Sequence, residues 1–325
     1  LEEDLGCAPQ EVFAELDPKP LAAASIAQVH RARLPDGTAV IIKVRRPGIR
    51  PTMEADLRLL ARMAELIEAE SAGLRRFKPR EVVRQFTLSL RRELDLVAEC
   101  RNAERIARNF TEHPEFVFPK VYWTWCSERV NVQEYIDGIP GRNLDAIDQA
   151  GLDRKVLAQH GAQAALKMIL EDGFFHADPH QGNIFYLSEN RIAFIDFGMV
   201  GRLPERRRYQ VVNLLHCMVE QDASGVVEVL LDWARDTAID TESLILEIEG
   251  FVDQYHGVPL KDFDLGIMLT ELTALLRDHA LNLPSDLVLL IKALITLEGV
   301  ARQLDPDFDM VAEASPFLQR AMLAR

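Results

Sequence analysis

The alternation of hydrophobic and polar residues near the start of the chain predicts two antiparallel strands. Residues 25–34 alternate loosely, residues 35–37 are the turn sequence Pro-Asp-Gly, and residues 38–44 are rich in β-branched side chains. Two such runs joined by a glycine-containing turn indicate a β-hairpin. The hairpin places Lys43 close to the end of its second strand.

A helical period follows the hairpin. After residue 48, apolar residues recur at spacings of three and four, which predicts an amphipathic helix with one buried face. The expected buried positions are Met53, Leu57, Leu60, Met63, Ala64 and Ile67. A second long helical stretch is expected over residues 79–110.

The first lobe is expected to end after two more strands. Residues 117–122 and 129–135 have strand-like patterns, and the Asp-Gly-Ile-Pro-Gly sequence at 137–141 is typical of a linker. We therefore expect an N-lobe over residues 1–135, with a small sheet and a helical insertion, and a C-lobe over residues 136–325.

The pattern of the C-lobe is mostly helical. Residues 153–170 predict a helix that ends near Gly173, and two short strands are expected at 183–187 and 191–195. From Pro204 onward nearly the whole sequence is expected to be helical. The fold class is therefore α/β (α+β), with a small antiparallel sheet and a large helical lobe.

Composition supports a folded protein and restricts its partners. Of the 325 residues, 48% are hydrophobic and 27% charged, which is ordinary for a globular protein with two substantial cores. The 37 basic and 51 acidic side chains give a net charge of −14, so we expect no nucleic-acid partner. Any phosphate-binding site must be a local positive feature.

Cysteine usage and hydropathy indicate a cytoplasmic protein without a transmembrane segment. The chain has four scattered cysteines, Cys7, Cys100, Cys126 and Cys217. They lack metal-ligand spacing, which suits reduced thiols. The longest apolar stretch, residues 287–297, is short and is interrupted by Lys292. The chain begins at Leu1 rather than at a methionine, which is typical of a fragment.

Three residues with the chemistry of phosphoryl transfer follow the first C-lobe helix. Asp178 and Asn183 are five positions apart in His-Ala-Asp-Pro-His-Gln-Gly-Asn, and Asp196 begins an Asp-Phe-Gly sequence after the short hairpin. This spacing is that of the kinase catalytic loop and its metal-binding Asp-Phe-Gly. Phosphoryl transfer needs a carboxylate near the nucleophile and oxygen ligands for Mg²⁺, and these residues supply both.

A kinase-like site also needs a strand lysine for the nucleotide phosphates and a helix carboxylate that orients it. Lys43 is the strand lysine, and the carboxylate candidates are Glu93, Asp95 and Glu99. Asp95 and Glu99 share a helix face, whereas Glu93 points elsewhere. Periodicity alone leaves the partner of Lys43 open.

The segment ahead of the lysine departs from kinases. Where a glycine-rich loop is expected, the chain has Ala22, Ala23, Ala24 and Ser25. Alanine lets a backbone approach phosphates but lacks the positive-φ freedom of glycine.

Taken together, these motifs resemble the UbiB/ADCK family, the AarF-domain atypical kinases with a two-lobed protein-kinase-like fold. The resemblance runs from the first residues to at least Val200, and an alanine-rich loop replaces the glycine loop in this family. It implies that Lys43 is the nucleotide-binding lysine, with Glu99 as its helix partner. Asp178 matches the catalytic-loop aspartate, and Asn183 and Asp196 match the Mg²⁺ ligands.

The resemblance assigns further residues and shows where the chain departs. Glu93 and Asp95 match the family's E-x-D pair, and Glu134 and Tyr135 match the hinge that holds adenine by backbone groups. The K-x-G-Q motif, expected to pack against the E-x-D pair, is absent because the chain begins after it. Ala27 and Gln181 stand where the family usually has glycine and proline.

The resemblance implies binding of ATP or ADP with Mg²⁺. The expected reaction is ATP hydrolysis or phosphotransfer to a small-molecule or lipid-linked acceptor, in support of ubiquinone or other isoprenoid quinone biosynthesis. The implied partners are a lipid or quinone precursor and a membrane-associated biosynthetic complex at the inner membrane. No A-P-E sequence follows Asp196, so phosphorylation of protein substrates is not expected.

Two other functions remain open. His176, Asp178 and His180 could bind a transition metal in a metallohydrolase, although Lys43 and Asp196 would then have no role. Alternatively, the protein could be a non-catalytic scaffold in which nucleotide occupancy organises a lipid-biosynthetic complex.

Overall fold

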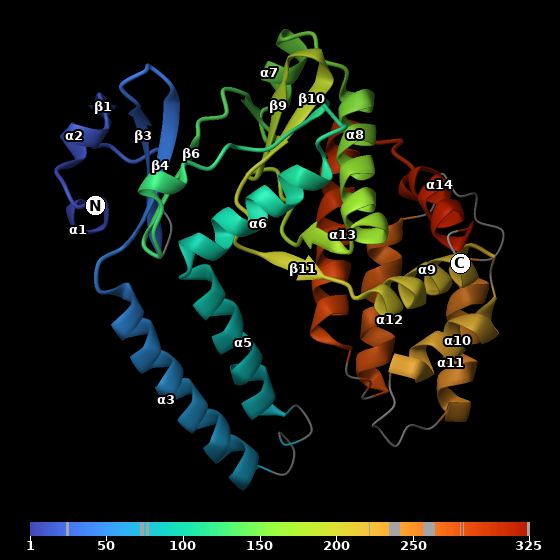
Figure 1. Ribbon diagram of the computed structural model, residues 1–325. Coiled ribbons are helices and arrows are strands. Elements are labelled where there is room, and N and C mark those ends of the chain that lie inside the picture. Colours follow the sequence, from blue (N-terminus) through green and yellow to red (C-terminus); the bar gives the residue numbers. More distant parts are fainter. Residues whose placement is uncertain are drawn as a thin grey trace. The chain divides into compact units, whose positions relative to one another are not determined.

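The computed structural model describes residues 1–23, 26–71, 75, 78–220, 222–233, 241–255, 264–279, 281 and 283–323 (Figure 1). Its contacts divide the chain into two compact units. The sheet unit comprises Leu1–Arg105, Phe118–Ile136 and Asp196–Met199. The helical unit comprises Ile106–Val117, Asp137–Ile195 and Val200–Arg325.

The sheet unit contains a five-stranded antiparallel sheet with the order β1-β3-β4-β6, and β2 also pairs with β3. Its strands are β1 (Glu15–Leu16), β2 (Ala22–Ala23), β3 (Ala27–Arg33), β4 (Ala39–Arg45) and β6 (Val130–Glu134). The hairpin predicted from the sequence is β3 and β4, and Gly37 in its turn has a φ of 88°. The strand predicted at 129–135 is β6.

The two faces of this sheet differ in polarity. One face carries Val40, Ile42, Val130 and Val132, which are fully buried and pack in one hydrophobic core with Phe13. Because side chains alternate along a strand, Lys43 lies on the opposite face, directly across from Asn131 of β6. The sheet therefore has an apolar face and a face that carries the lysine.

Three longer helices follow β4 in the chain: α3 (Ile49–Glu70), α5 (Pro79–Glu93) and α6 (Leu96–Asn109). The division into units falls within α6, after Arg105. The prediction of one helix over 79–110 is wrong, because Leu94 and Asp95 separate α5 from α6. The Asp95 carboxylate accepts the backbone N–H groups of Val97 (3.0 Å) and Ala98 (3.1 Å). Asp95 thus caps the start of α6, a role for which aspartate is preferred.

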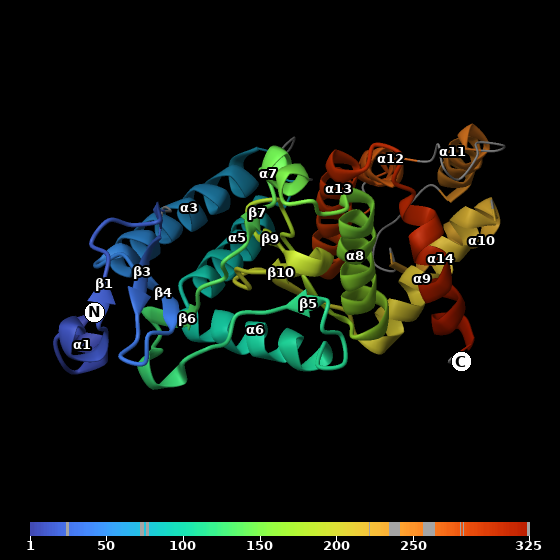
Figure 2. The same ribbon diagram turned by 90° about the horizontal axis from the view of Figure 1, so that it is seen from above.

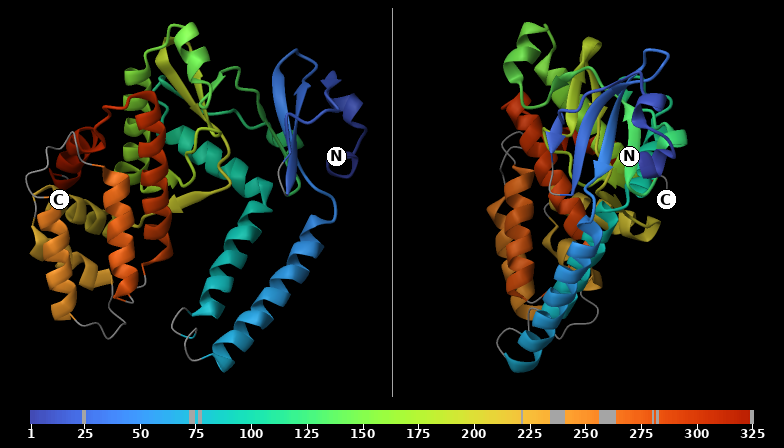
Figure 3. Two further views of the ribbon diagram at one scale, coloured as in Figure 1. Left: turned by 180° about the vertical axis from the view of Figure 1, so that it is seen from behind. Right: turned by 90° about the vertical axis from the view of Figure 1, so that its left-hand side faces the viewer.

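Helices α3 and α5 lie side by side as a hairpin (Figures 1 and 3). The buried face predicted for α3 is only partly correct. Leu57 and Ala64 are buried, but Leu60, Met63 and Ile67 are between 37% and 49% exposed. Periodicity predicts the direction of an apolar face but not how much of it a neighbouring helix covers.

The helical unit contains two small sheets. The larger has the order β5-β10-β9-β7, and the smaller pairs β8 with β11. Their strands are β5 (Phe116–Val117), β7 (Ile139–Pro140), β8 (Phe174–His176), β9 (Ile184–Leu187), β10 (Arg191–Phe194) and β11 (Val200–Arg202). The strands predicted at 183–187 and 191–195 are β9 and β10. The strand predicted at 117–122 is wrong beyond Val117, where only an isolated bridge at Val121 and a 3-10 turn follow.

The rest of the helical unit is built from helices, as predicted. They are α7 (Leu144–Gln149), α8 (Arg154–Leu166), α9 (Glu205–Val219), α10 (Ala223–Trp233), α11 (Thr241–Gln254), α12 (Leu265–Asp278), α13 (Ser285–Leu304) and α14 (Met310–Leu323). Helix α8 continues into a π turn, Lys167–Glu171. Helices α8 and α13 pack side by side (Figure 2). Within the described ranges, no helix is both long and apolar enough to cross a bilayer.

Candidate active site

The sheet unit brings together three of the predicted site residues. The Lys43 Nζ lies 2.9 Å from Glu99 Oε2 and 3.5 Å from Asp196 Oδ1. Lys43 comes from β4, Glu99 from α6, and Asp196 from the Asp-Phe-Gly sequence. Of the three helix carboxylates that periodicity left open, Glu99, the partner that the family resemblance implies, forms an ion pair with Lys43. We call Lys43, Glu99 and Asp196 the lysine triad.

The lysine triad combines burial with charge. The Lys43 side chain is 17% exposed and that of Glu99 is 5% exposed. Burial alone would lower the pKa of Lys43, but the carboxylates of Glu99 and Asp196 outweigh it and raise this pKa well above its usual range. The Lys43 ammonium therefore stays positively charged, and it is the local cation that a phosphate site in this acidic protein requires.

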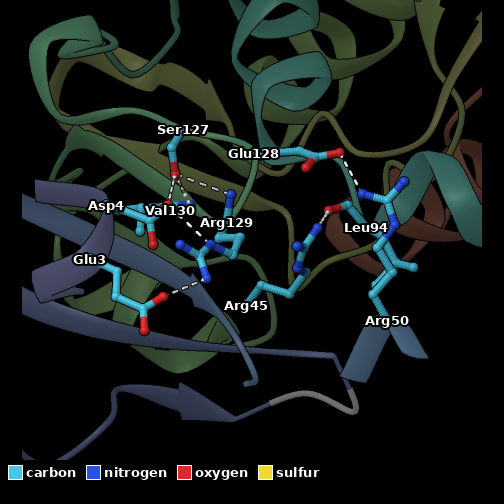
Figure 4. Close-up of polar contacts among 9 residues, drawn as sticks. All are labelled: Glu3, Asp4, Arg45, Arg50, Leu94, Ser127, Glu128, Arg129 and Val130. Atoms are coloured by element: carbon cyan, nitrogen blue, oxygen red, sulfur yellow. Dashed lines mark hydrogen bonds and ion pairs between the residues drawn. The ribbon is translucent and has the colours of Figure 1, made fainter. Parts of the chain in front are cut away.

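The position of Glu99 depends on the break between α5 and α6. The Arg45 guanidinium at the end of β4 donates to the carbonyl of Leu94 at 2.7 Å (Figure 4). The backbone N–H of Leu96 donates to the carbonyl of Glu128 at 3.2 Å. These bonds hold the junction before α6 to β4 and the first turn of α6 to the loop before β6, and Glu99 on that helix faces Lys43.

The loop before β6 is itself tied to distant segments (Figure 4). Arg129 forms ion pairs with Glu3 at 2.9 Å and Asp4 at 3.1 Å, both in α1 (Glu2–Leu5). Glu128 pairs with Arg50 at the start of α3 at 2.8 Å. These pairs are largely exposed, so each adds little to stability, but together they connect α1, α3 and the loop that supports α6.

The Asp-Phe-Gly sequence has an unusual backbone. Asp196 has a φ of 59°, in the left-handed region that few non-glycine residues adopt. Its carboxylate accepts the N–H of Gly198 at 3.3 Å, and Asn102 donates to the carbonyl of Phe197 at 3.0 Å. Phe197 is fully buried and its ring contacts Phe118. Such strain persists where surrounding contacts enforce it, as is common at functional sites.

The helical unit holds the other two predicted residues in a compact loop, Asp178 to Asn183. The Asn183 Nδ2 donates to the carbonyl of Asp178 at 3.1 Å, and the N–H of His180 donates to the same carbonyl at 2.8 Å. The Asn183 carbonyl accepts the N–H of Ile195 at 3.0 Å, immediately before Asp196. A side-chain amide binds cations through its oxygen, so Oδ1 is the Asn183 atom that can bind a cation while the amide nitrogen donates within the loop.

His176 stabilises this loop through both ring nitrogens. Its Nδ1 accepts the backbone N–H of Asp178 at 3.1 Å, and its Nε2 donates to the carbonyl of Ile195 at 3.0 Å. One neutral tautomer satisfies both bonds, which leaves neither nitrogen for a metal. Among the described residues, no group of three or more His, Cys, Asp or Glu side chains could hold a metal ion. His176 is therefore not available as a ligand, and the metallohydrolase hypothesis lacks one of the three side chains that it requires.

Sequence reasoning missed one residue of the loop's surroundings. The Lys292 Nζ from α13 lies 3.1 Å from Asp178 Oδ1, and the His180 Nε2 lies 3.8 Å from Asp178 Oδ2. In the sequence, the one sign of Lys292 is that it interrupts an apolar stretch. That interruption was the available signal, but it did not identify a partner.

The remaining predicted residues lie in the sheet unit. The N–H of Glu134 donates to the Lys120 carbonyl at 2.8 Å and that of Tyr135 to the Ala39 carbonyl at 3.0 Å. Adenine at these two residues would therefore have to bind carbonyl oxygens.

The structure describes the alanine-rich segment in part and the E-x-D pair in full, with Asp95 directly before α6. Ala22 and Ala23 form β2 and are exposed, whereas Ala24 and Ser25 lie outside the described residues. Glu93 is the last residue of α5, on a different helix from Glu99.

Comparison with known proteins gives two domain matches. Residues 1–230 match the ABC1 atypical kinase-like domain, and residues 248–309 match the UbiB helical domain. Proteins named probable protein kinase UbiB from Pseudomonas paraeruginosa strain PA7 and Azotobacter vinelandii are each 37% identical to this chain. These alignments cover 100% of this chain and 62% of each relative. The chain therefore spans about three fifths of the length of these relatives.

A solved structure shows the same fold. The structure of Rv3197 from Mycobacterium tuberculosis, in complex with erythromycin, matches with a TM-score of 0.69 and 22% sequence identity. The match covers 95% of this chain and 79% of that one. At this identity the likeness concerns the fold alone. With the kinase-like domain match, it confirms the predicted two-lobed kinase-like α/β fold.

Proposed function

Because this chain belongs to the ABC1 atypical kinase-like family, as its motifs predicted, we propose that it binds an adenine nucleotide with Mg²⁺ and hydrolyses or transfers the terminal phosphate. The observation that carries this proposal is the lysine triad, in which the Lys43 ammonium lies between Glu99 and Asp196. A buried, positively charged lysine oriented by a helix carboxylate is what kinase-like enzymes use to hold the α and β phosphates.

The side chains available for Mg²⁺ fit that ion. Mg²⁺ prefers oxygen ligands, and the two proposed ligands offer the Oδ1 of Asn183 and the carboxylate of Asp196. Asn183 is 8% exposed and its amide nitrogen donates within the loop, which fixes the oxygen as the ligand atom. When bound, Mg²⁺ would neutralise charge on the nucleotide phosphates.

Asp178 is the proposed base. In hydrolysis a water oxygen attacks the γ-phosphorus, a proton of that water passes to the Asp178 carboxylate, and the bond to the β–γ bridging oxygen breaks to release ADP. In transfer, an acceptor hydroxyl takes the place of water. The Asp178 side chain is 30% exposed, so an incoming hydroxyl can reach it.

The nucleotide site would be completed by residues that bind adenine and by the alanine-rich segment, residues 22–25. We assign adenine binding to backbone groups of Glu134 and Tyr135, and a phosphate-covering role to residues 22–25. The carbonyl acceptors at Glu134 and Tyr135 can pair with the exocyclic amino group of adenine, which is a donor.

We further propose that the reaction supports isoprenoid quinone biosynthesis. This rests on the relatives named UbiB and on the match to the UbiB helical domain. The acceptor or regulator would be a lipid or quinone precursor, within a biosynthetic complex at the cytoplasmic face of the inner membrane.

Nucleotide binding and turnover by purified protein test the proposal. We expect Mg²⁺-dependent ATP binding by calorimetry and release of ADP and phosphate, with and without a quinone-precursor mimic. Asp178→Asn should retain binding and reduce turnover by about 10² to 10⁴-fold, as for loss of a general base. Exposed Lys155, on α8, gives the control variant Lys155→Met, which should match the wild type.

The outcomes separate an enzyme from a scaffold. Binding without turnover, unaltered by the lipid mimic, would favour the nucleotide-gated scaffold. Turnover that survives Asp178→Asn unchanged would remove the catalytic role assigned to this residue. Absence of Mg²⁺-dependent nucleotide binding would refute the proposed function as a whole.

A further inference from the structure

Helix α13 places a charged residue beside the loop from Asp178 to Asn183, which we call the catalytic loop because Asp178 is the proposed base. The Lys292 Nζ lies 3.1 Å from Asp178 Oδ1, within ion-pair distance. Lys292 belongs to the region that matches the UbiB helical domain, whereas Asp178 belongs to the region that matches the kinase-like domain. The ion pair thus joins the two matched domains inside the helical unit.

The packing of α13 places this lysine beside the loop. One face of α13 is apolar and includes the buried residues Leu290, Leu294 and Leu297, and the helix packs against α8 and β11. Strand β11 pairs with β8, which ends at His176, two residues before Asp178. The same elements that bury α13 therefore also fix the start of the catalytic loop.

Stability does not account for this pair. The side chains of Lys292 and Asp178 are 47% and 30% exposed, and pairs this accessible to water contribute little to folding. In contrast, a carboxylate that takes a proton next to nucleotide phosphates is repelled by their charge. A lysine at hydrogen-bond distance offsets this repulsion and fixes the direction of the carboxylate.

We propose that Lys292 is a positioning residue for phosphoryl transfer, which holds the Asp178 carboxylate in the direction from which it takes the proton of the attacking hydroxyl. This inference rests on the proposed function. It gives the helical domain a part in the reaction, because the loop's aspartate is oriented by a side chain from outside the kinase-like domain.

ATP turnover and nucleotide binding of full-length variants test the inference. Lys292→Met should lower kcat by about 10²-fold, the effect of a misplaced reacting group, with the nucleotide Kd unchanged. Lys292→Arg should restore part of the turnover, because it keeps a donor cation. Lys292→Glu should lose more than Lys292→Met, because it repels Asp178. Lys155→Met is the matched control, an exposed lysine of the same unit.

A double variant shows whether Lys292 acts through Asp178. In the Asp178→Asn background, Lys292→Met should cause no further loss. If the two losses multiply, Lys292 acts independently of Asp178 and the inference is wrong. An unchanged or increased kcat in Lys292→Met would also overturn it, an increase meaning that the pair restrains the aspartate. If the wild type itself shows no turnover, the proposed function fails and the inference fails with it. Normal turnover in Lys292→Met, with an active wild type, would refute the inference alone.

Discussion

The lysine triad and the catalytic loop, which we propose act in one reaction, are held in different ways. In the sheet unit, Lys43, Glu99 and Asp196 come from three distant parts of the chain, and the largely buried pair of Lys43 and Glu99 meets the half-exposed Asp196. In the helical unit, the bonds that shape the loop from Asp178 to Asn183 mostly join neighbours in sequence. The triad therefore depends on the packing of its whole unit, whereas the loop depends on its own backbone and a few supports.

This difference predicts that substitutions in the triad affect stability most. Lys43→Met should lower the free energy of unfolding of the sheet unit by about 3–5 kcal/mol, because it leaves the Glu99 carboxylate buried without its cation. Chemical denaturation would measure the loss. Nucleotide affinity should fall as well.

A second substitution distinguishes two causes of this loss of stability: the uncompensated charge of Glu99 and the lost packing of the Lys43 side chain. Adding Glu99→Gln to Lys43→Met removes the uncompensated charge and should recover much of the lost stability without recovering nucleotide binding. If the double variant is as unstable as the single variant, the loss comes from packing of the lysine side chain rather than from the buried carboxylate.

Elements that depend on local contacts could be predicted from the sequence. Asp178 and Asn183, five positions apart, lie in one loop that the Asn183 amide closes by donating to the Asp178 carbonyl, whereas their roles stay a prediction. The hairpins β3–β4 and β9–β10 were predicted for the same reason, because alternation and turn residues are local signals.

The distant contacts could not be predicted in this way. Periodicity left the partner of Lys43 open, and only the family resemblance pointed to Glu99. The residues do not show that Asp95 would cap a new helix, which places Glu93 and Glu99 on different helices. Lys292 reaches Asp178 from a helix far along the chain, and only the packing of α13 reveals the contact. The exposure of Met63 on α3 could not be predicted either, because it depends on how much of the apolar face another helix covers.

The stability of the catalytic loop should respond to steric change more than to loss of charge. A Cβ on Gly141 would lie 2.6 Å from the Gln181 carbonyl oxygen, closer than atoms tolerate, so Gly141→Ala must displace the loop backbone. We expect a loss of about 1–3 kcal/mol in the stability of the helical unit, as for overpacking. Turnover should fall while the sheet unit keeps its stability.

Hydrogen exchange would locate this effect. Protection should drop in the loop and in β9, and not at Lys43 or α6. The control is Gly299→Ala in α13, in the same unit, where an added Cβ meets nothing within 4 Å and φ, as at Gly141, lies outside the left-handed region. If Gly299→Ala loses as much stability and turnover as Gly141→Ala, contact with Gln181 does not explain the result.

The smallest expected effect concerns the cap that sets the position of Glu99. Asp95→Ala removes the acceptor for the N–H groups of Val97 and Ala98 and should cost about 1 kcal/mol. Asp95→Asn keeps a side-chain oxygen and should cost much less, because asparagine is an equally good N-cap. Since α6 carries Glu99, Asp95→Ala should also weaken nucleotide binding slightly, and Asp95→Asn should not. If Asp95→Asn impairs binding as much as Asp95→Ala, the charge of Asp95 matters beyond capping, and the family's E-x-D pair would have a direct role in the site.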